Sequence, residues 1–242
     1  MAEGSETKAK TKAMRLYSGP LSMFGAKAQI AALEKGIAFE LVMVPFTTQH
    51  LYEPKHPDVL RVNPKRQVPV LIHGEVEIFD STQIFEYLEH VQPEPPLWPP
   101  APADRARARL LEHLSDEVYF PHVIRLMGLQ ALPHDPIAVA SREGAAQFYA
   151  EVERRLGQHE HEFLAGSYSY ADIAFYMAQV FGVRMGAQPD DSTPRLLAWR
   201  ERVGARPAVR EVVGAMVAYL VSHGRPIPAF LASLLPPAPK PT

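Results

Sequence analysis

Residues 63–81, NPKRQVPVLIHGEVEIFDS, hold the run of signals that decides the fold of this chain. Val68-Pro69-Val70-Leu71-Ile72 is an apolar run that predicts a strand, and His73-Gly74 predicts a turn. Residues 75–78 alternate polar and apolar side chains, as the second strand of a hairpin does. Asp80-Ser81 is a pair suited to begin a helix, and apolar residues recur after it at helical spacing. This stretch therefore predicts a hairpin that leads directly into a helix.

The chain before this hairpin predicts a strand, a helix and a second strand. Met14 to Tyr17 form a short apolar run, and Ala26 to Leu33 show helical spacing up to Gly36, which is suited to end a helix. Residues 39–43 then alternate as a strand does. A strand–helix–strand unit of this length implies parallel strands. Residues 46–66 carry several prolines and predict an irregular loop with at most a short helix.

Prolines separate this first part of the chain from a second part that is helical throughout. Six of the ten residues from Pro93 to Pro102 are prolines, which predicts a linker. Beyond it we predict a helix whose apolar stripe is Leu110, Leu111, Leu114 and Val118 and which is broken or kinked at Pro121. Four further helices are predicted over Gly144–Leu164, Asp172–Met185, Pro194–Val203 and Pro207–Val221. The predicted division is a flexible arm (1–13), an α/β domain (14–92), the linker (93–102), an all-helical domain (103–235) and a flexible tail (236–242).

The composition limits the classes of protein to which the chain can belong. Its 242 residues are 47 % apolar, and no apolar stretch approaches the ~20 residues of a membrane span. The net charge of −2 argues against a strong nucleic-acid or membrane partner. The absence of cysteine removes disulfides, thiolate metal sites and a cysteine nucleophile, and is compatible with the cytoplasm.

Five groups of residues resemble, in order and spacing, motifs of the glutathione transferase family, and in particular of its serine-type, bacterial-like members. They are Leu16-Tyr17 with Ser22, Asn63-Pro64 with Gln67 to Leu71, Asp80-Ser81, Ser169 to Asp172, and Trp199 with Arg206-Pro207. The resemblance spans roughly residues 14–222. It implies a thioredoxin-like domain followed by a helical bundle, glutathione as co-substrate, no metal and a homodimer.

The resemblance assigns Val68 and Pro69 to the binding of glutathione. It implies that Pro69 is cis and that the backbone of Val68 pairs with the cysteinyl part of the tripeptide, as an added strand pairs with a sheet edge. The alternative is an ordinary trans proline at the start of a strand.

Asp80 and Ser81 would hold the γ-glutamyl end of glutathione. A helix N-terminus supplies N–H groups for its carboxylate, Ser81 can add a hydroxyl, and Asp80 can pair with its ammonium. Simple helix capping, worth ~1 kcal/mol, is the alternative, and the two roles can coexist.

Ser22 is the predicted catalytic residue, because serine-type members place their active hydroxyl after the first strand. It would donate a hydrogen bond to the glutathione sulfur. Lowering a thiol pKa from ~8.5 to ~6.5 needs roughly 2.7 kcal/mol, which one charge-assisted hydrogen bond at a helix N-terminus can supply. Tyr17 resembles the tyrosine of other classes and stays an alternative, while Ser18 lies too close to the strand end.

The glycyl carboxylate of glutathione would be held by Lys55 and Gln67, with His50 or Arg66 as further possibilities. Lys55 can equally be a solvated loop charge. Many family members have a glycine where this chain has Arg66, so the shape of the loop before Gln67 is left open.

Ser169 and Asp172 resemble the N-capping motif of the family. Serine at the cap and an acid three residues later satisfy two backbone N–H groups of a helix. We therefore predict a structural role for both, not a catalytic one.

The resulting hypothesis is transfer of glutathione to a small, apolar electrophile bound against the helical domain. Glutathione-dependent isomerisation of the maleylacetoacetate isomerase kind, or dehalogenation, is the first alternative, and a non-catalytic glutathione- or ligand-binding module is the second. Tyr119 and Phe120 stand where the family lines its electrophile pocket, although ordinary core positions also explain them.

Overall fold

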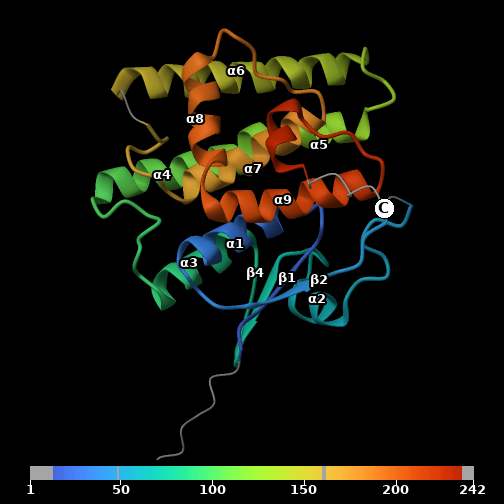
Figure 1. Cartoon of the computed structure of the whole chain (residues 1–242), viewed down its shortest axis with the longest axis vertical. Coiled ribbons are helices and arrows are strands. Elements are labelled where there is room, and N and C mark those ends of the chain that lie inside the picture. Colours follow the sequence, from blue (N-terminus) through green and yellow to red (C-terminus); the bar gives the residue numbers. More distant parts are fainter. Residues whose placement is uncertain (1–12, 48, 160–161, 236–242) are drawn as a thin grey trace, which may run out of the picture.

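A computed structural model of the chain describes residues 13–47, 49–159 and 162–235. Residues 1–12 of the predicted arm and the whole predicted tail, 236–242, lie outside the described part. The described chain forms a four-stranded sheet with flanking helices, above which stands an all-helical region (Figure 1).

The first part of the chain confirms the predicted β-α-β, loop, β-β-α order. Its elements are β1 (Arg15–Ser18), α1 (Met23–Glu34), β2 (Glu40–Met43), α2 (Pro57–Val62), β3 (Val70–His73), β4 (Val76–Phe79) and α3 (Ser81–Val91). The strand order is β2-β1-β3-β4, with β1 and β2 parallel and the β1–β3 and β3–β4 pairs antiparallel. The order and pairing are those of a thioredoxin-like domain.

The alternation of side chains along β1 and β3 builds two apolar layers. Leu16 and Leu71 point to the face that α1 and α3 cover, where they join the main core. Tyr17, Val70 and Ile72 point to the opposite face and pack with Val59 of α2 and with Val44. Because successive strand residues face opposite sides, both layers follow from one run of apolar residues.

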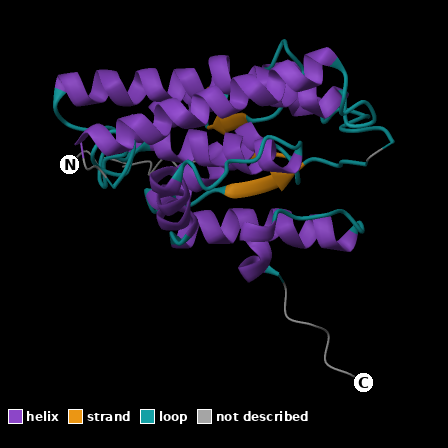
Figure 2. Ribbon diagram, turned by 90° about the horizontal axis from the view of Figure 1, so that it is seen from above, coloured by secondary structure: helices purple, strands orange, loops and turns teal. Residues whose placement is uncertain are grey.

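The second part of the chain is helical. Its elements are α4 (Pro102–Leu114), a π-helical turn η1 (Ser115–Tyr119), α5 (Phe120–Gly128), α6 (Pro136–His159), α7 (Tyr170–Arg184), α8 (Pro194–Gly204), α9 (Pro207–Ser222) and a 3₁₀ turn η2 (Ala229–Leu234). Almost all of α7 is buried among the others. Seen from above, these helices partly cover the sheet (Figure 2).

Two predictions about the helical part were wrong. The helix predicted over 144–164 runs from Pro136 to His159, because Asp135 accepts a hydrogen bond from the Ile137 N–H (2.8 Å) and Pro136 stands in the first turn. The apolar stripe was also misplaced, since Leu110 is 51 % and Val118 46 % exposed. The π-helical turn, which ends at Tyr119, breaks the regular helical period, so Val118 falls outside the buried face. In α4 the buried position is that of Leu111 and not that of its neighbour Leu110.

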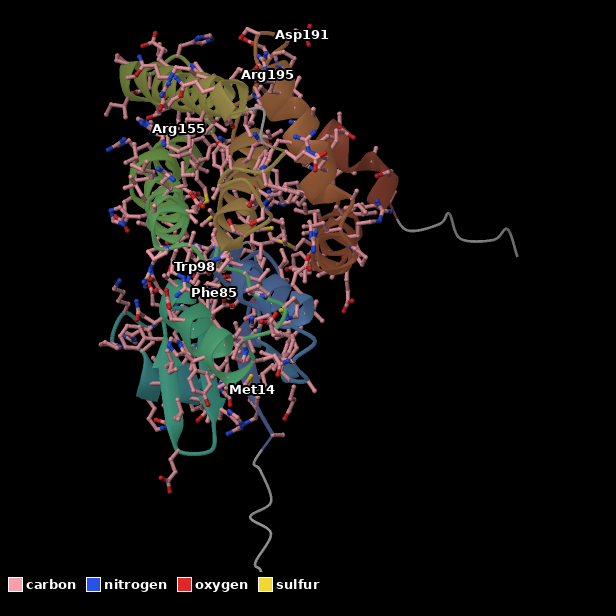
Figure 3. The ribbon with its side chains drawn as sticks, turned by 90° about the vertical axis from the view of Figure 1, so that its left-hand side faces the viewer. Met14, Phe85, Trp98, Arg155, Asp191 and Arg195 are labelled. Atoms are coloured by element: carbon pink, nitrogen blue, oxygen red, sulfur yellow. The ribbon has the colours of Figure 1, made fainter. Side chains whose placement is uncertain are left out.

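The two parts share one core. The main cluster of buried side chains runs from β1 and α1 through α3 into α7, α8 and α9. Phe85 of α3 stacks on Tyr170 of α7 with ring centroids 3.9 Å apart, and Trp98 meets both rings edge-on. Figure 3 shows Phe85 and Trp98 at the boundary between the sheet region and the helices.

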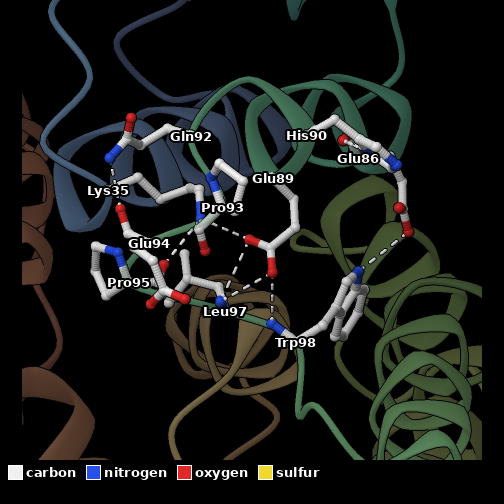
Figure 4. A network of polar contacts seen from close by, with 10 residues as sticks. All are labelled: Lys35, Glu86, Glu89, His90, Gln92, Pro93, Glu94, Pro95, Leu97 and Trp98. Carbon is white, nitrogen blue, oxygen red and sulfur yellow. Dashed lines mark hydrogen bonds and ion pairs between the residues drawn. The ribbon is translucent and has the colours of Figure 1, made fainter.

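The proline-rich segment between α3 and α4 is clamped to α1 and α3. Lys35 Nζ lies 2.7 Å from the Glu89 carboxylate and donates to the carbonyl of Pro95 (2.8 Å). Glu89 also accepts from the N–H groups of Leu97 and Trp98, both at 3.1 Å (Figure 4). Residues 93–102 stay the proposed boundary between the domains, and these bonds hold the chain there in place.

Candidate active site

Two adjoining hollows lie between the sheet region and the helical region. Both are lined by Phe24, Gln67 and Val68. The first, of about 140 Å³, reaches Asp80 and Ser81, and the second, of about 370 Å³, reaches Ser22. The fold therefore gathers into one cleft the predicted residues Ser22, Lys55, Gln67, Val68, Pro69, Asp80 and Ser81, but not the alternatives His50 and Tyr17.

Ser22 lies where β1 gives way to α1. Its hydroxyl oxygen caps α1 by accepting the N–H of Gly25 at 3.0 Å, and its side chain lines the larger hollow. An accepting hydroxyl keeps its own hydrogen for a further acceptor. The serine thus presents a hydrogen-bond donor beside the positive end of a helix.

Tyr17 and Ser18 face elsewhere. The Tyr17 hydroxyl donates to Asp58 (2.6 Å) on the far face of the sheet, and burial together with that bond raises the pKa of Tyr17 to about 12. The Ser18 hydroxyl accepts from Gln29 (2.8 Å) and is fully buried. Neither side chain lines the cleft, so the geometry favours Ser22.

The Val68–Pro69 peptide bond is cis. Val68 precedes β3, and within the described residues its backbone N–H and C=O form no hydrogen bond. Unpaired backbone groups at the end of a strand, beside a cleft, are sites where an extended peptide can bind.

The loop before Val68 has the shape that glycine would allow. Arg66 has φ +57°, in the left-handed region, so it occupies with a side chain a conformation that glycine adopts without strain. Asn63 holds this loop, because its amide donates to the Gln67 carbonyl (2.6 Å) and its side-chain oxygen accepts from the Lys65 N–H (2.9 Å). Arg66 therefore takes, with a side chain, a backbone conformation that glycine favours.

Asp80 and Ser81 form the N-terminus of α3. Asp80 Oδ1 accepts from the N–H groups of Thr82 (3.0 Å) and Gln83 (3.3 Å). Ser81 is almost wholly buried, and its carbonyl accepts from the hydroxyl of Tyr170 at 3.0 Å. The capping role and an opening toward the smaller hollow thus occur together.

Asp116 and Glu117 line the same small hollow from the helical side, and the sequence did not reveal them. The π-helical turn carries both residues toward the hollow. Asp116 Oδ1 is buried with no hydrogen-bond partner among the described residues, and burial raises the pKa of Asp116 to about 6. Only the proline at 121 hinted at an irregular turn nearby.

The larger hollow has an apolar floor and basic groups on its lining. Phe120, Ile124 and Met127 of α5 contribute to the floor, so Phe120 lines the cleft while Tyr119 belongs to the core. The basic groups are those of Lys55, whose ammonium lies 3.5 Å from Glu53, together with His56 and Arg66; His50 does not line the hollow.

Ser169 and Asp172 lie away from the cleft and form the capping box of α7. The buried Asp172 carboxyl accepts from the N–H groups of Ser169 and Leu164 and from the indole of Trp199 (2.8 Å). Every contact of this acid is structural.

Two classes of feature are missing from the described residues. None of their helices combines the length and hydrophobicity that crossing a membrane requires. The same residues hold no cluster of three or more His, Cys, Asp or Glu side chains placed to bind a metal ion.

Comparison with known proteins identifies the family. Residues 16–96 match the model of the glutathione S-transferase N-terminal domain, and residues 138–213 match that of the C-terminal domain. A "Probable glutathione S-transferase" from rice (Oryza sativa subsp. japonica) is 32 % identical over 216 residues, covering 81 % of this chain and 87 % of that protein. The chain belongs to the glutathione S-transferase family.

Two further relatives extend the comparison. A glutathione S-transferase from Methylobacterium radiotolerans, solved in complex with glutathione sulfonate, is 28 % identical, with a TM-score of 0.69 and coverage of 84 % of this chain and 95 % of that one. A stringent starvation protein A homolog from Coxiella burnetii is 33 % identical over 113 residues, which are 46 % of this chain and half of that relative's length.

Proposed function

We propose that this protein conjugates reduced glutathione to a small, apolar electrophile, with Ser22 stabilising the thiolate. The observation that carries the proposal is the unpaired backbone of Val68, a residue that lines both the hollow containing Ser22 and the hollow containing Ser81. A tripeptide paired with Val68 would point one end toward Ser81 and its sulfur toward Ser22.

The charges along the cleft match those of glutathione. At one end, the γ-glutamyl carboxylate would meet the N-terminus of α3 and Ser81, and its ammonium would meet Asp80 and Asp116. At the other end, the glycyl carboxylate would meet Lys55, Gln67 and Arg66. The acidic and basic ends fix the direction in which the peptide lies.

Ser22 would make the sulfur reactive near neutral pH. Its hydroxyl donates to the thiolate, and the N-terminus of α1 adds partial positive charge, so the ionised form is favoured over the thiol. The thiol proton leaves to water. The thiolate then forms a carbon–sulfur bond with the electrophile, and the leaving group departs with its bonding electron pair.

The apolar floor formed with Phe120, Ile124 and Met127 would hold the electrophile beside the sulfur. Chlorinated aromatic compounds activated by nitro groups are suitable test substrates, because they are apolar and release chloride on conjugation. The homodimer and the cytoplasmic location implied by the family belong to this proposal. Size-exclusion chromatography with light scattering tests the dimer.

The direct test is isothermal titration with reduced glutathione, comparing the unmodified chain, Ser81→Ala and the control Ser222→Ala, which changes an exposed serine that lines neither hollow. We expect saturable binding that Ser81→Ala weakens and Ser222→Ala leaves unchanged. No detectable binding at ~10 mM glutathione, a concentration far above a useful affinity, would rule out the proposal.

A further inference from the structure

A separate pocket lies on the helical domain, away from the cleft. It is formed between α7, α8, α9 and the 3₁₀ turn η2, and it shares no lining residue with either hollow of the cleft. In Figure 1 the red segment that follows α9 folds back beside α8 and α9. Residues of η2, in this segment, line one side of the pocket. Its cavity measures about 110 Å³.

Arg200 is the central group of this pocket. Its guanidinium lies over the ring of Phe230, 4.2 Å from the ring centroid, and its Nε is buried with no hydrogen-bond partner among the described residues. No carboxylate in the described chain lies within 4.0 Å of it. A half-buried guanidinium without an acceptor is unfavourable, so an anionic group that entered the pocket would be stabilised there.

The neighbouring arginines show how different Arg200 is. Arg195 on the same helix pairs with Glu153 (3.1 Å), Arg202 donates to the Glu162 carbonyl (2.8 Å), and Arg206 forms a two-point pair with Glu34. Each of these arginines has an acceptor from a distant part of the chain. Arg200 instead lines the pocket.

The remaining lining gives the pocket a net positive charge and both polar and apolar surface. Arg210 adds a second guanidinium and Glu201 one carboxylate, so the excess is a single positive charge. Phe230, Leu231 and Leu234 of η2 supply the apolar surface, and Ser233 of the same turn also lines the pocket.

Tyr176 closes the floor with its ring and hydroxyl. Gly204 leaves space for that hydroxyl, because a Cβ atom at position 204 would stand only 2.9 Å from the Tyr176 oxygen. The hydroxyl of Tyr176 and the guanidinium of Arg200 thus line one small cavity, and both can donate hydrogen bonds.

We propose that this pocket is a binding site for a small carboxylate that carries an apolar body and a single negative charge. A guanidinium pairs with a carboxylate through two parallel hydrogen bonds, and the tyrosine hydroxyl can donate a third. The side of the pocket formed by Phe230, Leu231 and Leu234 suits a small aromatic or aliphatic body. The single excess charge suits a monoanion better than a phosphate dianion, whose desolvation is more costly. Glutathione and the electrophile have their own place in the cleft, so this ligand binds in addition to them.

Titration of the full chain with benzoate tests the proposal, with benzamide as a neutral compound of nearly the same shape and inorganic phosphate as a dianion. We expect saturable binding of benzoate, no binding of benzamide, and weaker binding of phosphate. Arg200→Met should weaken benzoate at least tenfold. Arg107→Met, which removes a charge that is exposed on α4 and paired with Asp104, should not.

A second variant separates a lost site from a disturbed fold. Ser233 is exposed on η2, so Ser233→Phe should fill the mouth of the pocket, abolish benzoate binding and leave the unfolding midpoint in urea unchanged. Three results would overturn the proposal. Benzoate could bind Arg200→Met as tightly as the unmodified chain, glutathione could displace it, or it could bind no better than benzamide.

Discussion

The ammonium of Lys27 in α1 and the carboxylate of Asp116 in η1 lie 2.5 Å apart, and Lys27 has no exposed surface. Glu112 approaches the same ammonium at 3.1 Å and accepts from the hydroxyl of Thr82 at 2.6 Å. Burial raises the pKa of Asp116 to about 6, with Lys27 opposing and Glu112 reinforcing the rise. One buried lysine therefore joins the sheet domain to two acids of the helical domain at the edge of the cleft.

This arrangement predicts a change of glutathione affinity with pH. Asp116 is charged above about pH 6, where it can pair with the ligand's ammonium, and neutral below it. The sulfur of bound glutathione also ionises near this pH, so the titration uses S-methylglutathione, which has no thiol and whose other groups do not titrate between about pH 5 and pH 7. We expect affinity to fall as the pH drops through about 6, and Asp116→Asn to remove that step and weaken binding about tenfold at neutral pH. Titration calorimetry at several pH values measures this, with the exposed Asp104→Asn as control.

The same carboxyl affects the free energy of unfolding with a definite sign. Its pKa is higher in the folded chain than in the unfolded chain, where it is about 4, so the folded state binds the proton more tightly. Its contribution to stability is therefore present below about pH 4 and is lost as the pH rises to about 6. Urea unfolding measures this. The free energy of unfolding should change with pH in the same way for the unmodified chain and for Asp116→Asn outside this window, and differently within it.

Replacing Ser22 should separate catalysis from binding. Ser22→Ala removes the donor to the thiolate, so the thiol pKa in the complex should rise by about two units and kcat/KM should fall roughly 100-fold. The affinity for total glutathione should change little below about pH 6, where the bound sulfur stays protonated with or without Ser22, and should fall at higher pH. Tyr17→Phe, which removes only the bond to Asp58, should leave the thiol pKa unchanged. Ultraviolet absorbance of the thiolate against pH measures both variants, and a thiol pKa in Ser22→Ala as low as in the unmodified chain would exclude the serine.

The apolar floor of the larger hollow should affect the affinity for the electrophile but not the affinity for glutathione. Ile124 is 48 % exposed and lines that hollow, so Ile124→Ala should raise KM for an apolar electrophile several-fold without harming the fold. Its KM for glutathione should stay the same. Val118→Ala removes a similarly exposed side chain that lines neither hollow, and its kinetics should match those of the unmodified chain. Equal effects of the two variants would contradict this position for the electrophile.

Because Arg66 has a left-handed backbone, replacing it with glycine should maintain or raise the stability of the chain but weaken its binding of glutathione. Arg66→Gly relieves the side chain of a strained φ, so the free energy of unfolding should stay level or rise by up to about 1 kcal/mol. The loss of a cation should weaken the hold on the glycyl carboxylate and raise KM for glutathione. Arg66→Val should instead destabilise the chain, because branched residues tolerate this region poorly. Urea unfolding and initial rates measure the two effects separately.

The clamp on the proline-rich segment should matter for folding and not for the chemistry of the cleft. Glu89→Gln leaves the ammonium of Lys35 without its buried carboxylate and weakens the bonds to Leu97 and Trp98. We expect a loss of about 3 kcal/mol in the free energy of unfolding. Glu94→Gln, at an exposed position in the same segment, should be neutral. Glutathione KM should be unchanged in the folded fraction of both variants.

The backbone near Val68, Asp80 and Ser81 could be predicted from the sequence because each signal is local, whereas a role for these residues in binding glutathione was implied by the resemblance to the family. A proline within an apolar run, a Gly turn, and an Asp-Ser pair before a helical pattern act on their own backbone or on the next few residues. These local preferences determined the hairpin, the N-terminus of α3 and the exposed backbone before β3. They also made the order of strands and helices predictable.

The helical side of the cleft was decided only by tertiary structure. Asp116 and Ile124 line it because a π-helical turn and the packing of Tyr119 set the direction of α5, and a buried lysine 89 residues earlier in the chain holds the acid. Likewise, Arg200 and Phe230 meet only when η2 folds back on α8. Such contacts join distant segments through the packing of the whole core, so no short stretch of sequence contains them.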